Sequence, residues 1–212
     1  MKIAIFGGSG ATGRLLTRRC IDGEHEVTAL LRRPGSFDMR GHIHVVEGSV
    51  FDANAVERTV AGADAVLSAL GAHSLRREDV LERAVPVIVA AMQRKGVRRI
   101  IVLGSAGARD GAMARQAGWR RWIVEHVVNR TLLKWPVASQ RAQYAALAAS
   151  NLDWTMAMPP MLTHGSGRGR WRVDAEALPP GASRIAREDV ASFMMQQLEE
   201  REWVGKGVYV SW

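Results

Sequence analysis

Short apolar runs alternate along the chain with segments in which apolar residues recur at helical spacing. The apolar runs lie at 2–6, 25–31, 43–46, 65–70, 100–103, 151–158 and 207–210. Spacing of three or four residues predicts helices after Gly10 and over 53–61, 77–95, 139–149 and 187–200. The alternation predicts an α/β fold, a Rossmann-like doubly wound parallel sheet with helices on both faces.

Single residues refine the boundaries of these elements. Asp52 and Ser139 are expected to cap the helices that begin beside them, because a short polar side chain accepts a hydrogen bond from the first turn. Pro86 interrupts the 77–95 pattern, so we expect a kink or a later helix start. The 187–200 helix carries an apolar stripe that should face the core, formed by Val190, Phe193, Met194 and Leu198.

Two stretches depart from the alternation. Within 109–135, apolar residues at helical spacing would lie on one arc of a helix: Trp119, Trp122, Ile123, Val127 and Leu133. Two polar residues, His126 and Arg130, fall within the same arc. A helix that lines a pocket and a surface helix packed on the core both fit this arc, and we favour the second. Residues 163–180 are rich in glycine, arginine and proline. There we expect loops around one hairpin-like strand at 170–174, followed by a small strand at 183–185.

The clearest motif lies at the first turn, where an apolar run leads directly into Gly7-x-x-Gly10-x-x-Gly13. Glycines at this spacing permit a tight turn and let a pyrophosphate approach the backbone. The helix that follows offers free N–H groups and the positive end of its dipole. The alternative is a turn that is packed by glycines and holds no ligand. We favour a dinucleotide site with contacts from Gly7, Ser9, Gly10, Ala11, Thr12 and Gly13.

The end of the second strand indicates which dinucleotide is bound. In dinucleotide folds this position meets the adenosine ribose, and an acidic residue there selects NAD. Here Arg32 and Arg33 occupy the position. Because a guanidinium pairs with a 2′-phosphate, we expect NADP, with NADPH preferred over NADH. The alternative is a solvated pair of surface arginines.

The carboxyl ends of the other strands should meet at the same edge, where ligands of such sheets lie. Ser105 follows the fifth apolar run, and Pro159 and Pro160 end the sixth. Prolines there stop the ladder and stiffen the backbone beside the ligand. We expect further cofactor contacts from Ser49, Val50, Ala69, Leu70, Gly71, Ser105, Pro159 and Pro160.

Composition narrows the class of protein. The 29 Lys and Arg residues against 21 Asp and Glu give a net charge of +8, which favours anionic ligands. The basic residues are scattered as pairs, without a nucleic-acid-binding motif, so we do not expect the protein to bind nucleic acid.

Cys20 is the single cysteine, which excludes a disulfide framework, and no metal site is expected. No apolar run is long enough for a membrane span and the chain opens on a strand, so we expect a cytoplasmic protein that is a monomer or weak homodimer.

Four segments carry a resemblance to a known family. They are Gly-Gly-Ser-Gly-Ala-Thr-Gly at 7–13, Gly-Ala-Asp-Ala-Val-Leu-Ser-Ala-Leu-Gly at 62–71, Leu-Asp-Trp-Thr-Met-Ala-Met-Pro-Pro at 152–160 and Ile-Ala-Arg-Glu-Asp-Val-Ala-Ser-Phe at 185–193. Together they resemble the atypical short-chain dehydrogenases/reductases, and within them the branch of biliverdin-IXβ and flavin reductases. The resemblance implies a single NAD(P)-binding domain over 1–212, with a small C-terminal lobe on the substrate side.

The resemblance also implies a reaction, an NADPH-dependent hydride transfer to a flat conjugated acceptor such as a flavin, a quinone or a linear tetrapyrrole. Ser105 matches the serine near the nicotinamide, so it is the expected catalytic residue. Met161 stands where the biliverdin-IXβ reductases have a histidine, and His164 lies three residues further on. Both are expected to contact the small-molecule acceptor.

One departure from the wider family leaves the chemistry open. Ordinary short-chain dehydrogenases use a Tyr-x-x-x-Lys pair, whereas here Tyr144 is followed four residues later by Ala148. A carbonyl reductase that relies on this pair is therefore not expected. Flavins and quinones need less acid catalysis, since water can supply the proton. The alternatives are an NmrA-like redox sensor that binds dinucleotide without turnover and, ranked last, an epimerase- or dehydratase-like enzyme.

Overall fold

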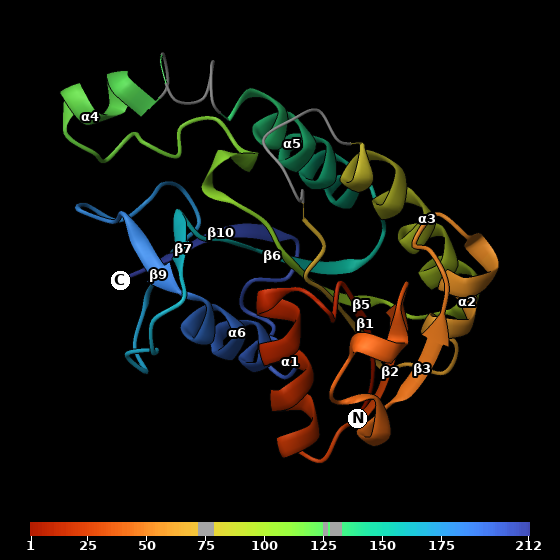
Figure 1. The fold of residues 1–212 in the computed structure, drawn as a ribbon. Coiled ribbons are helices and arrows are strands. Elements are labelled where there is room, and N and C mark those ends of the chain that lie inside the picture. Colours follow the sequence, from red (N-terminus) through yellow and green to blue (C-terminus); the bar gives the residue numbers. More distant parts are fainter. Residues whose placement is uncertain (72–78, 125–126, 128–132) are drawn as a thin grey trace.

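The main sheet of this computed structural model, which describes residues 1–71, 79–124, 127 and 133–212, has eight strands (Figure 1). Their order is β3-β2-β1-β4-β5-β6-β10-β8, and all neighbours are parallel except β8 and β10. The strands are β1 Lys2–Phe6, β2 Glu26–Leu31, β3 His44–Glu47, β4 Ala65–Ser68, β5 Arg99–Leu103, β6 Asp153–Met158, β8 Arg172–Asp174 and β10 Lys206–Ser211. A second, two-stranded sheet pairs β7 Met161–Thr163 with β9 Arg184–Ala186 in parallel.

Helices cover both faces of the main sheet, which confirms the predicted doubly wound α/β fold. One face carries α1 Ala11–Asp22 and α6 Arg187–Gln196, which pack on each other. The other face carries α2 Ala53–Val60, α3 Val80–Lys95 and α5 Lys134–Ala148. Short 3-10 turns lie at η1 Pro34–Ser36, η2 Arg40–His42 and η3 Ala106–Ala108, and a short helix, α4 Gly118–Ile123, lies toward the outside of the molecule (Figure 1).

The strand β1, which lies inside the sheet between β2 and β4, shows why the apolar runs become buried parallel strands. Successive side chains of a strand point to opposite faces. Ile3 and Ile5 therefore pack in the core beneath α1 and α6, while Ala4 and Phe6 pack beneath α2 and α3. All four side chains are buried, which explains why this run is continuously apolar rather than alternating.

Most predicted boundaries agree with the structure, with shifts at some ends. The Asp52 carboxylate accepts a hydrogen bond from the Asn54 N–H at 2.9 Å, so the predicted cap of α2 is confirmed. The fourth strand ends at Ser68, two residues before the predicted end. The last helix ends at Gln196 rather than at residue 200, although its predicted stripe is buried as far as Leu198.

The starts of two helices differ from the predicted ones. The third helix begins at Val80, after the predicted residue 77, and Pro86 lies inside it rather than at its start. The fifth helix begins at Lys134, and Ser139 lies inside it rather than at its cap. The Ser139 hydroxyl instead donates to the Glu82 carboxylate of α3 at 3.0 Å. That contact joins two helices far apart in the sequence, so local rules for caps could not foresee it.

Among the described residues of the predicted arc in 109–135, the tryptophans of α4 are not packed on the core. The helix α4 covers only residues 118–123, and Leu133 lies outside a helix. Trp119 and Trp122 are 69% and 59% exposed rather than buried. His126 and Arg130, which interrupt the predicted arc, lie outside the described residues.

The first helix buries the single cysteine. Cys20 is fully buried, and burial raises the pKa of its thiol to about 12. A thiol that stays protonated is a poor nucleophile. Cys20 is therefore a packing residue.

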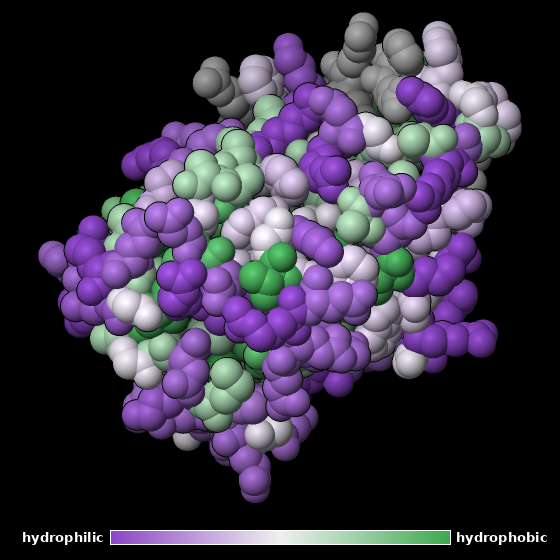
Figure 2. All heavy atoms as spheres, turned by 180° about the vertical axis from the view of Figure 1, so that it is seen from behind, coloured by the Kyte–Doolittle hydropathy of each residue, from purple (hydrophilic) through white to green (hydrophobic). Residues whose placement is uncertain are grey.

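The outer surface matches the composition. In the view from behind, hydrophilic side chains dominate and hydrophobic ones form only small clusters (Figure 2). None of the helices in the part of the chain that the structure describes has the length and apolar character of a membrane span.

Candidate functional site

The glycine turn between β1 and α1 is built by two close backbone approaches. Gly7 has φ +75°, and a Cβ on it would lie 2.7 Å from the carbonyl carbon of Ala69. A Cβ on Gly13 would lie 2.0 Å from the carbonyl oxygen of Gly7. Only glycine fits at both positions, so the first turn of the helix packs directly against the end of the strand.

The start of α1 is left open toward solvent. Gly10 donates to the Gly7 carbonyl at 3.0 Å, and no side chain caps the helix. Ser9, Gly10 and Ala11 are exposed, while Thr12 and Gly13 are buried beneath them. Uncapped N–H groups at a helix start can bind a phosphate, so these residues fit the pyrophosphate of a dinucleotide.

A small pocket of about 110 Å³ lies beside this turn. Nine residues expected from the sequence line it: Gly7, Ser9, Gly10, Arg32, Ser49, Val50, Ala69, Leu70 and Gly71. The carboxyl ends of β1, β2 and β4 bring them together, as the parallel sheet requires. The apolar residues among them suit the flat face of an adenine ring.

Arg32 and Arg33 occupy different places, although they are neighbours in the sequence. Both are exposed, but Arg32 lines the pocket, whereas Arg33 lies outside the described lining and precedes the turn η1. Arg14 of α1 lies near the same edge of the pocket, where it donates a hydrogen bond to the Ser9 carbonyl at 3.3 Å and forms an ion pair with Asp38. The pocket edge that would meet the ribose is therefore basic, with one nearby carboxylate.

Sequence reasoning did not single out the aromatic wall of this pocket. Phe51 lines it, is 40% exposed, and carries the Arg83 guanidinium 4.3 Å from its ring centroid. Val80, the first residue of α3, completes the wall. The sequence did contain a signal for Phe51, because it directly follows Val50, which was expected to contact the cofactor.

The ends of β5 and β6 are fastened together beside a second, larger cavity. The Gly104 N–H donates to the Ala157 carbonyl at 2.7 Å, and the Ala106 N–H donates to the Pro159 carbonyl at 2.8 Å. These bonds hold Ser105, which is half-buried in extended conformation, between them. Ser105 thus sits on a rigid edge, as a residue that orients a ligand must.

The larger cavity is an open cleft of about 1500 Å³. Ser105, Pro159, Pro160 and Met161 line it, while His164 is exposed and lies outside the described lining. Its charged lining is mostly basic, with one acidic residue, and consists of Arg109, Arg121, Lys134, Arg141, Arg187 and Asp110. Sequence reasoning missed these basic residues, which come from four separate segments. The excess of positive charge favours an anionic ligand in the cleft.

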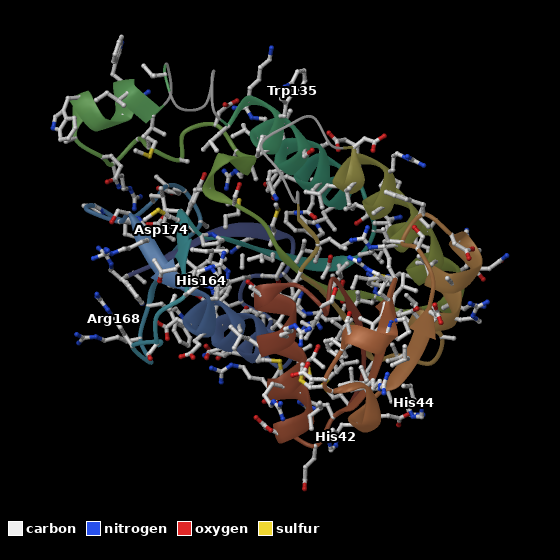
Figure 3. All side chains as sticks on the ribbon, viewed as in Figure 1. His42, His44, Trp135, His164, Arg168 and Asp174 are labelled. Carbon is white, nitrogen blue, oxygen red and sulfur yellow. The ribbon has the colours of Figure 1, made fainter. Side chains whose placement is uncertain are left out.

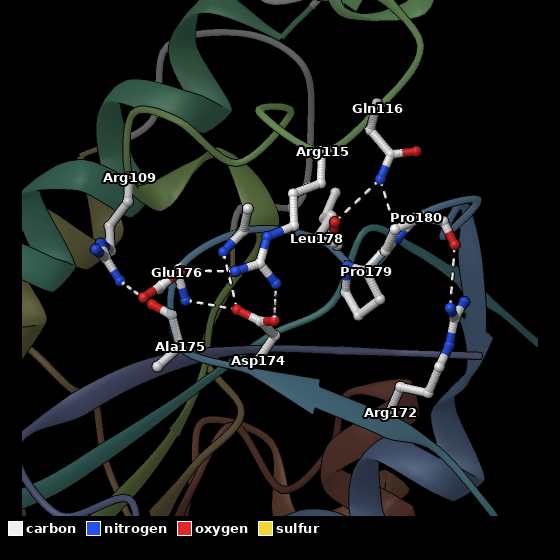
Figure 4. A network of polar contacts seen from close by, with 11 residues as sticks. Arg109, Arg115, Gln116, Arg172, Asp174, Ala175, Glu176, Leu178, Pro179 and Pro180 are labelled. Atoms are coloured by element: carbon white, nitrogen blue, oxygen red, sulfur yellow. Dashed lines mark hydrogen bonds and ion pairs between the residues drawn. The ribbon is translucent and has the colours of Figure 1, made fainter.

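One wall of the cleft is held by polar contacts between the 109–116 segment and the residues after β8 (Figure 4). Arg115 forms ion pairs with Asp174 and with Glu176, the latter at 2.6 Å. The Gln116 amide donates to the carbonyls of Leu178 and Pro179 at 3.0 and 2.8 Å. The irregular 109–116 segment therefore has a fixed position despite its lack of regular structure.

The charge of Asp174 belongs to the same network. Burial alone would raise its pKa, but the N–H groups of Glu176 and Ala177 and the Arg115 guanidinium lower it below the ordinary value. The carboxylate is therefore charged at neutral pH and keeps its ion pair.

The first turn of α6 contributes Arg187 to the cleft and holds the neighbouring loop through Asp189. Asp189 is buried, and its carboxylate accepts hydrogen bonds from the Arg168 and Gly169 N–H groups at 2.8 and 3.0 Å. The Trp212 indole N–H donates to it at 2.6 Å. Asp189 thus anchors the loop that follows β7. Arg168 extends to the outside, with its guanidinium 3.8 Å from the Trp212 ring centroid (Figure 3).

Tyr144 does not face the cleft. Its ring meets the Trp154 ring edge-on, with centroids 5.4 Å apart, and the Arg109 guanidinium lies 5.7 Å from its centroid. Tyr144 is absent from the described lining. It is a packing residue of the α5 side, and Ser105 has no tyrosine beside it among the described lining residues.

Comparison with known proteins agrees with this geometry. The sequence profile described as NAD(P)H-binding matches residues 7–201. A Saccharomyces cerevisiae protein of the UPF0659 group is 26% identical over 212 residues, which covers 93% of this chain and 87% of that protein. An uncharacterised protein of Mycobacterium tuberculosis is 32% identical over 106 residues, half of this chain but only 12% of the longer protein.

Solved structures share the whole fold. A putative exported protein of Burkholderia pseudomallei is 26% identical, with a TM-score of 0.81 and full coverage of both chains. A short-chain dehydrogenase/reductase of Veillonella parvula, solved in complex with NADP, has a TM-score of 0.78 at 20% identity, covering 100% of this chain and 94% of that one. ChuY, an anaerobillin reductase of Escherichia coli O157:H7, has a TM-score of 0.82 at 16% identity, covering 100% and 97%.

Proposed function

The chain belongs to the NAD(P)H-binding family, and on that premise we propose that it is an NADPH-dependent reductase of the atypical short-chain dehydrogenase/reductase type. The proposed acceptor is a flat conjugated molecule, a flavin, a quinone or a linear tetrapyrrole. The observation that carries the proposal is the arrangement of two pockets on one sheet edge. The small pocket beside the glycine turn fits an adenosine, and the cleft at Ser105 has room for a nicotinamide and an acceptor together.

Positioning is the main contribution of this chain to the reaction. When bound, NADPH supplies a hydride, and a proton from water completes the two-electron reduction of the acceptor. The glycine turn and the start of α1 hold the pyrophosphate. Ser105 and the Pro159–Pro160 backbone orient the reacting ring, and the acceptor lies across the cleft toward Met161.

The charge of the cleft supports acceptors that carry an anionic group. Basic residues outnumber acidic ones along the described lining by five to one. A flavin phosphate or a tetrapyrrole carboxylate would pair with them. ChuY, which has the same fold, is described as acting on anaerobillin.

The proposal is tested by incubating the purified protein with NADPH and a panel of acceptors. The panel contains FMN, riboflavin, a soluble quinone and a linear tetrapyrrole, and NADPH oxidation is followed by the loss of its absorbance. We expect turnover with at least one acceptor, and anionic acceptors should have the lower KM. Tight NADPH binding without turnover of any acceptor would overturn the proposal.

NADPH preference is the first specific prediction. Arg32→Glu places a carboxylate where Arg32 would meet the 2′-phosphate, so the Kd for NADPH should rise about 30- to 100-fold, or about 2–3 kcal/mol. The Kd for NADH should change less than about threefold. Fluorescence titration with both cofactors measures the two constants.

Arg33→Glu is the matched control for that prediction. It makes the same charge change at the next residue, which is exposed and outside the described lining of the pocket. We expect only a small loss of NADPH affinity. Equal losses in the two variants, or equal losses for NADPH and NADH, would remove the 2′-phosphate role of Arg32.

A second candidate is a dinucleotide sensor without turnover, similar to NmrA. The observation that favours it is the packing of Tyr144 against Trp154, which leaves Ser105 without a tyrosine–lysine pair. Such a protein would bind NADP⁺ and NADPH, reduce no acceptor, and bind a protein partner in a pull-down that depends on the redox state of the dinucleotide.

A further inference from the structure

Exposed aromatic side chains are concentrated at one end of the molecule. Among the described residues, five of the eight exposed large hydrophobic side chains lie within 119–135. Two others, Phe51 and Met161, line the pockets described above. We use the term tryptophan tip for Trp119, Trp122 and Ile123 of α4, Trp135 at the start of α5, and the basic residues Arg121 and Lys134.

The three exposed tryptophans of the tip differ from the others in the chain. Trp119, Trp122 and Trp135 are 69%, 59% and 38% exposed, whereas Trp154, Trp171, Trp203 and Trp212 are buried or half-buried. Exposing large rings to water is costly, and a group of exposed rings marks an interaction surface. Trp119 and Trp122 lie three residues apart on α4 and so share one side of that helix. Trp135, at the start of α5, lies on the same upper side of the view as α4, which is further to the left (Figures 1 and 3).

The tip is also basic. Its two charged residues, Arg121 and Lys134, are both basic. The Lys134 ammonium lies 4.9 Å from the Trp135 ring centroid, which places charge and aromatic surface side by side. Tryptophan beside lysine and arginine is the composition that favours the interface of an anionic bilayer.

We propose that the tryptophan tip docks the protein on the surface of an anionic lipid bilayer. The rings would enter the headgroup region, and the basic side chains would pair with lipid phosphates. Docking of this kind is peripheral and needs no membrane-spanning helix. A second copy of the chain is a poorer occupant, because two tips that each carry two basic side chains repel one another.

The tip borders the cleft. Arg121 and Lys134 of the tip belong to its described lining, together with Val124 and Leu133. A docked molecule would therefore present the rim of the cleft to the bilayer. This consequence, which rests on the proposed function, makes a lipid-soluble quinone the acceptor that docking would favour.

Sedimentation with lipid vesicles tests the docking. The full-length protein is mixed with vesicles of phosphatidylcholine alone or of an equal mixture with phosphatidylglycerol. We expect binding to the anionic vesicles only, weakened by high salt because the attraction is partly electrostatic. Trp119→Ser/Trp122→Ser should lower the partition coefficient by at least about tenfold, since two large rings leave the interface.

The control variants separate docking from general charge attraction. Arg18→Gln/Arg58→Gln removes two charges from exposed residues of α1 and α2, far from the tip in the sequence, and should bind as the unchanged protein does. Equal loss of binding in this variant would overturn the proposal. So would absence of binding to anionic vesicles, or full competition by a short single-stranded RNA that binds through the same two tryptophans.

A second readout keeps this inference distinct from the proposed reductase function. Trp119→Ser/Trp122→Ser should keep normal turnover of a soluble acceptor, since neither residue belongs to the described lining of the cleft, and should slow reduction of a quinone embedded in anionic vesicles. Loss of all turnover in the unchanged protein would remove the reductase proposal but leave vesicle binding intact. Normal quinone reduction in vesicles by the double variant would remove the link between docking and acceptor.

Discussion

Gly13→Ala should lower the free energy of unfolding by about 3 kcal/mol and raise the Kd for NADPH at least about 100-fold. The added methyl group would lie 2.0 Å from the Gly7 carbonyl oxygen and 2.8 Å from the Cα of Gly8. Both neighbours are backbone atoms, so no side-chain rotation relieves the contact. The first turn of α1 must move away from β1, which displaces the N–H groups that would hold the pyrophosphate. Urea unfolding and fluorescence titration with NADPH measure the two effects.

Two other glycines are matched controls for this variant. Gly41→Ala adds a methyl group that meets nothing within 4 Å, so stability and NADPH affinity should both stay close to normal. Gly10→Ala meets only the Gly7 carbonyl oxygen, at 3.4 Å, and lines the small pocket. It should fold normally and weaken NADPH binding. Normal NADPH affinity in Gly13→Ala would contradict the role assigned to the turn.

Asp189→Ala should destabilise the protein by about 4 kcal/mol, the second large effect. The substitution removes the buried acceptor of three hydrogen bonds, which come from the N–H groups of Arg168 and Gly169 and from the indole N–H of Trp212. The loop after β7 and the end of the chain then lose the contact that holds them to α6. Thermal unfolding gives the stability, and limited proteolysis reports whether cleavage begins in residues 164–171.

Glu188→Ala is the comparison for Asp189→Ala, because among the described contacts the Glu188 carboxylate accepts one hydrogen bond, from the Gly167 N–H at 2.7 Å. Its loss should cost about 1 kcal/mol. If the two variants lost similar amounts of unfolding free energy, the additional hydrogen bonds and the burial of Asp189 would make no extra contribution to stability.

The cofactor half of the molecule could be predicted because its signals are local. The apolar run of β1, the three glycines and the arginine that ends β2 follow one another within 32 residues. Each has a direct physical reason for its position, and parallel strands must bring their ends to one edge. Even so, the aromatic wall at Phe51 was missed, since its contact with Arg83 of α3 depends on tertiary packing.

The acceptor half could not be predicted to the same extent because long-range contacts build it. The 109–116 segment has no periodicity, and its position is set by ion pairs with residues about sixty positions later. The start of α5 was placed too late, partly because Pro136 precedes the predicted cap. A proline in the first turn is tolerated, since the N–H group there has no partner within the helix.

The two pockets use separate parts of the chain, and this has an evolutionary consequence. Residues 6–80 line the small pocket and residues 104–187 line the cleft, with no residue shared among those that the structure describes. Mutations that reshape the cleft therefore leave the adenosine pocket unchanged. During evolution, substitutions in the second half of the chain can therefore change the acceptor. The dinucleotide pocket in the first half is inherited without change. For protein engineering, the same separation makes residues 104–187 the natural region to randomise when new acceptors are sought.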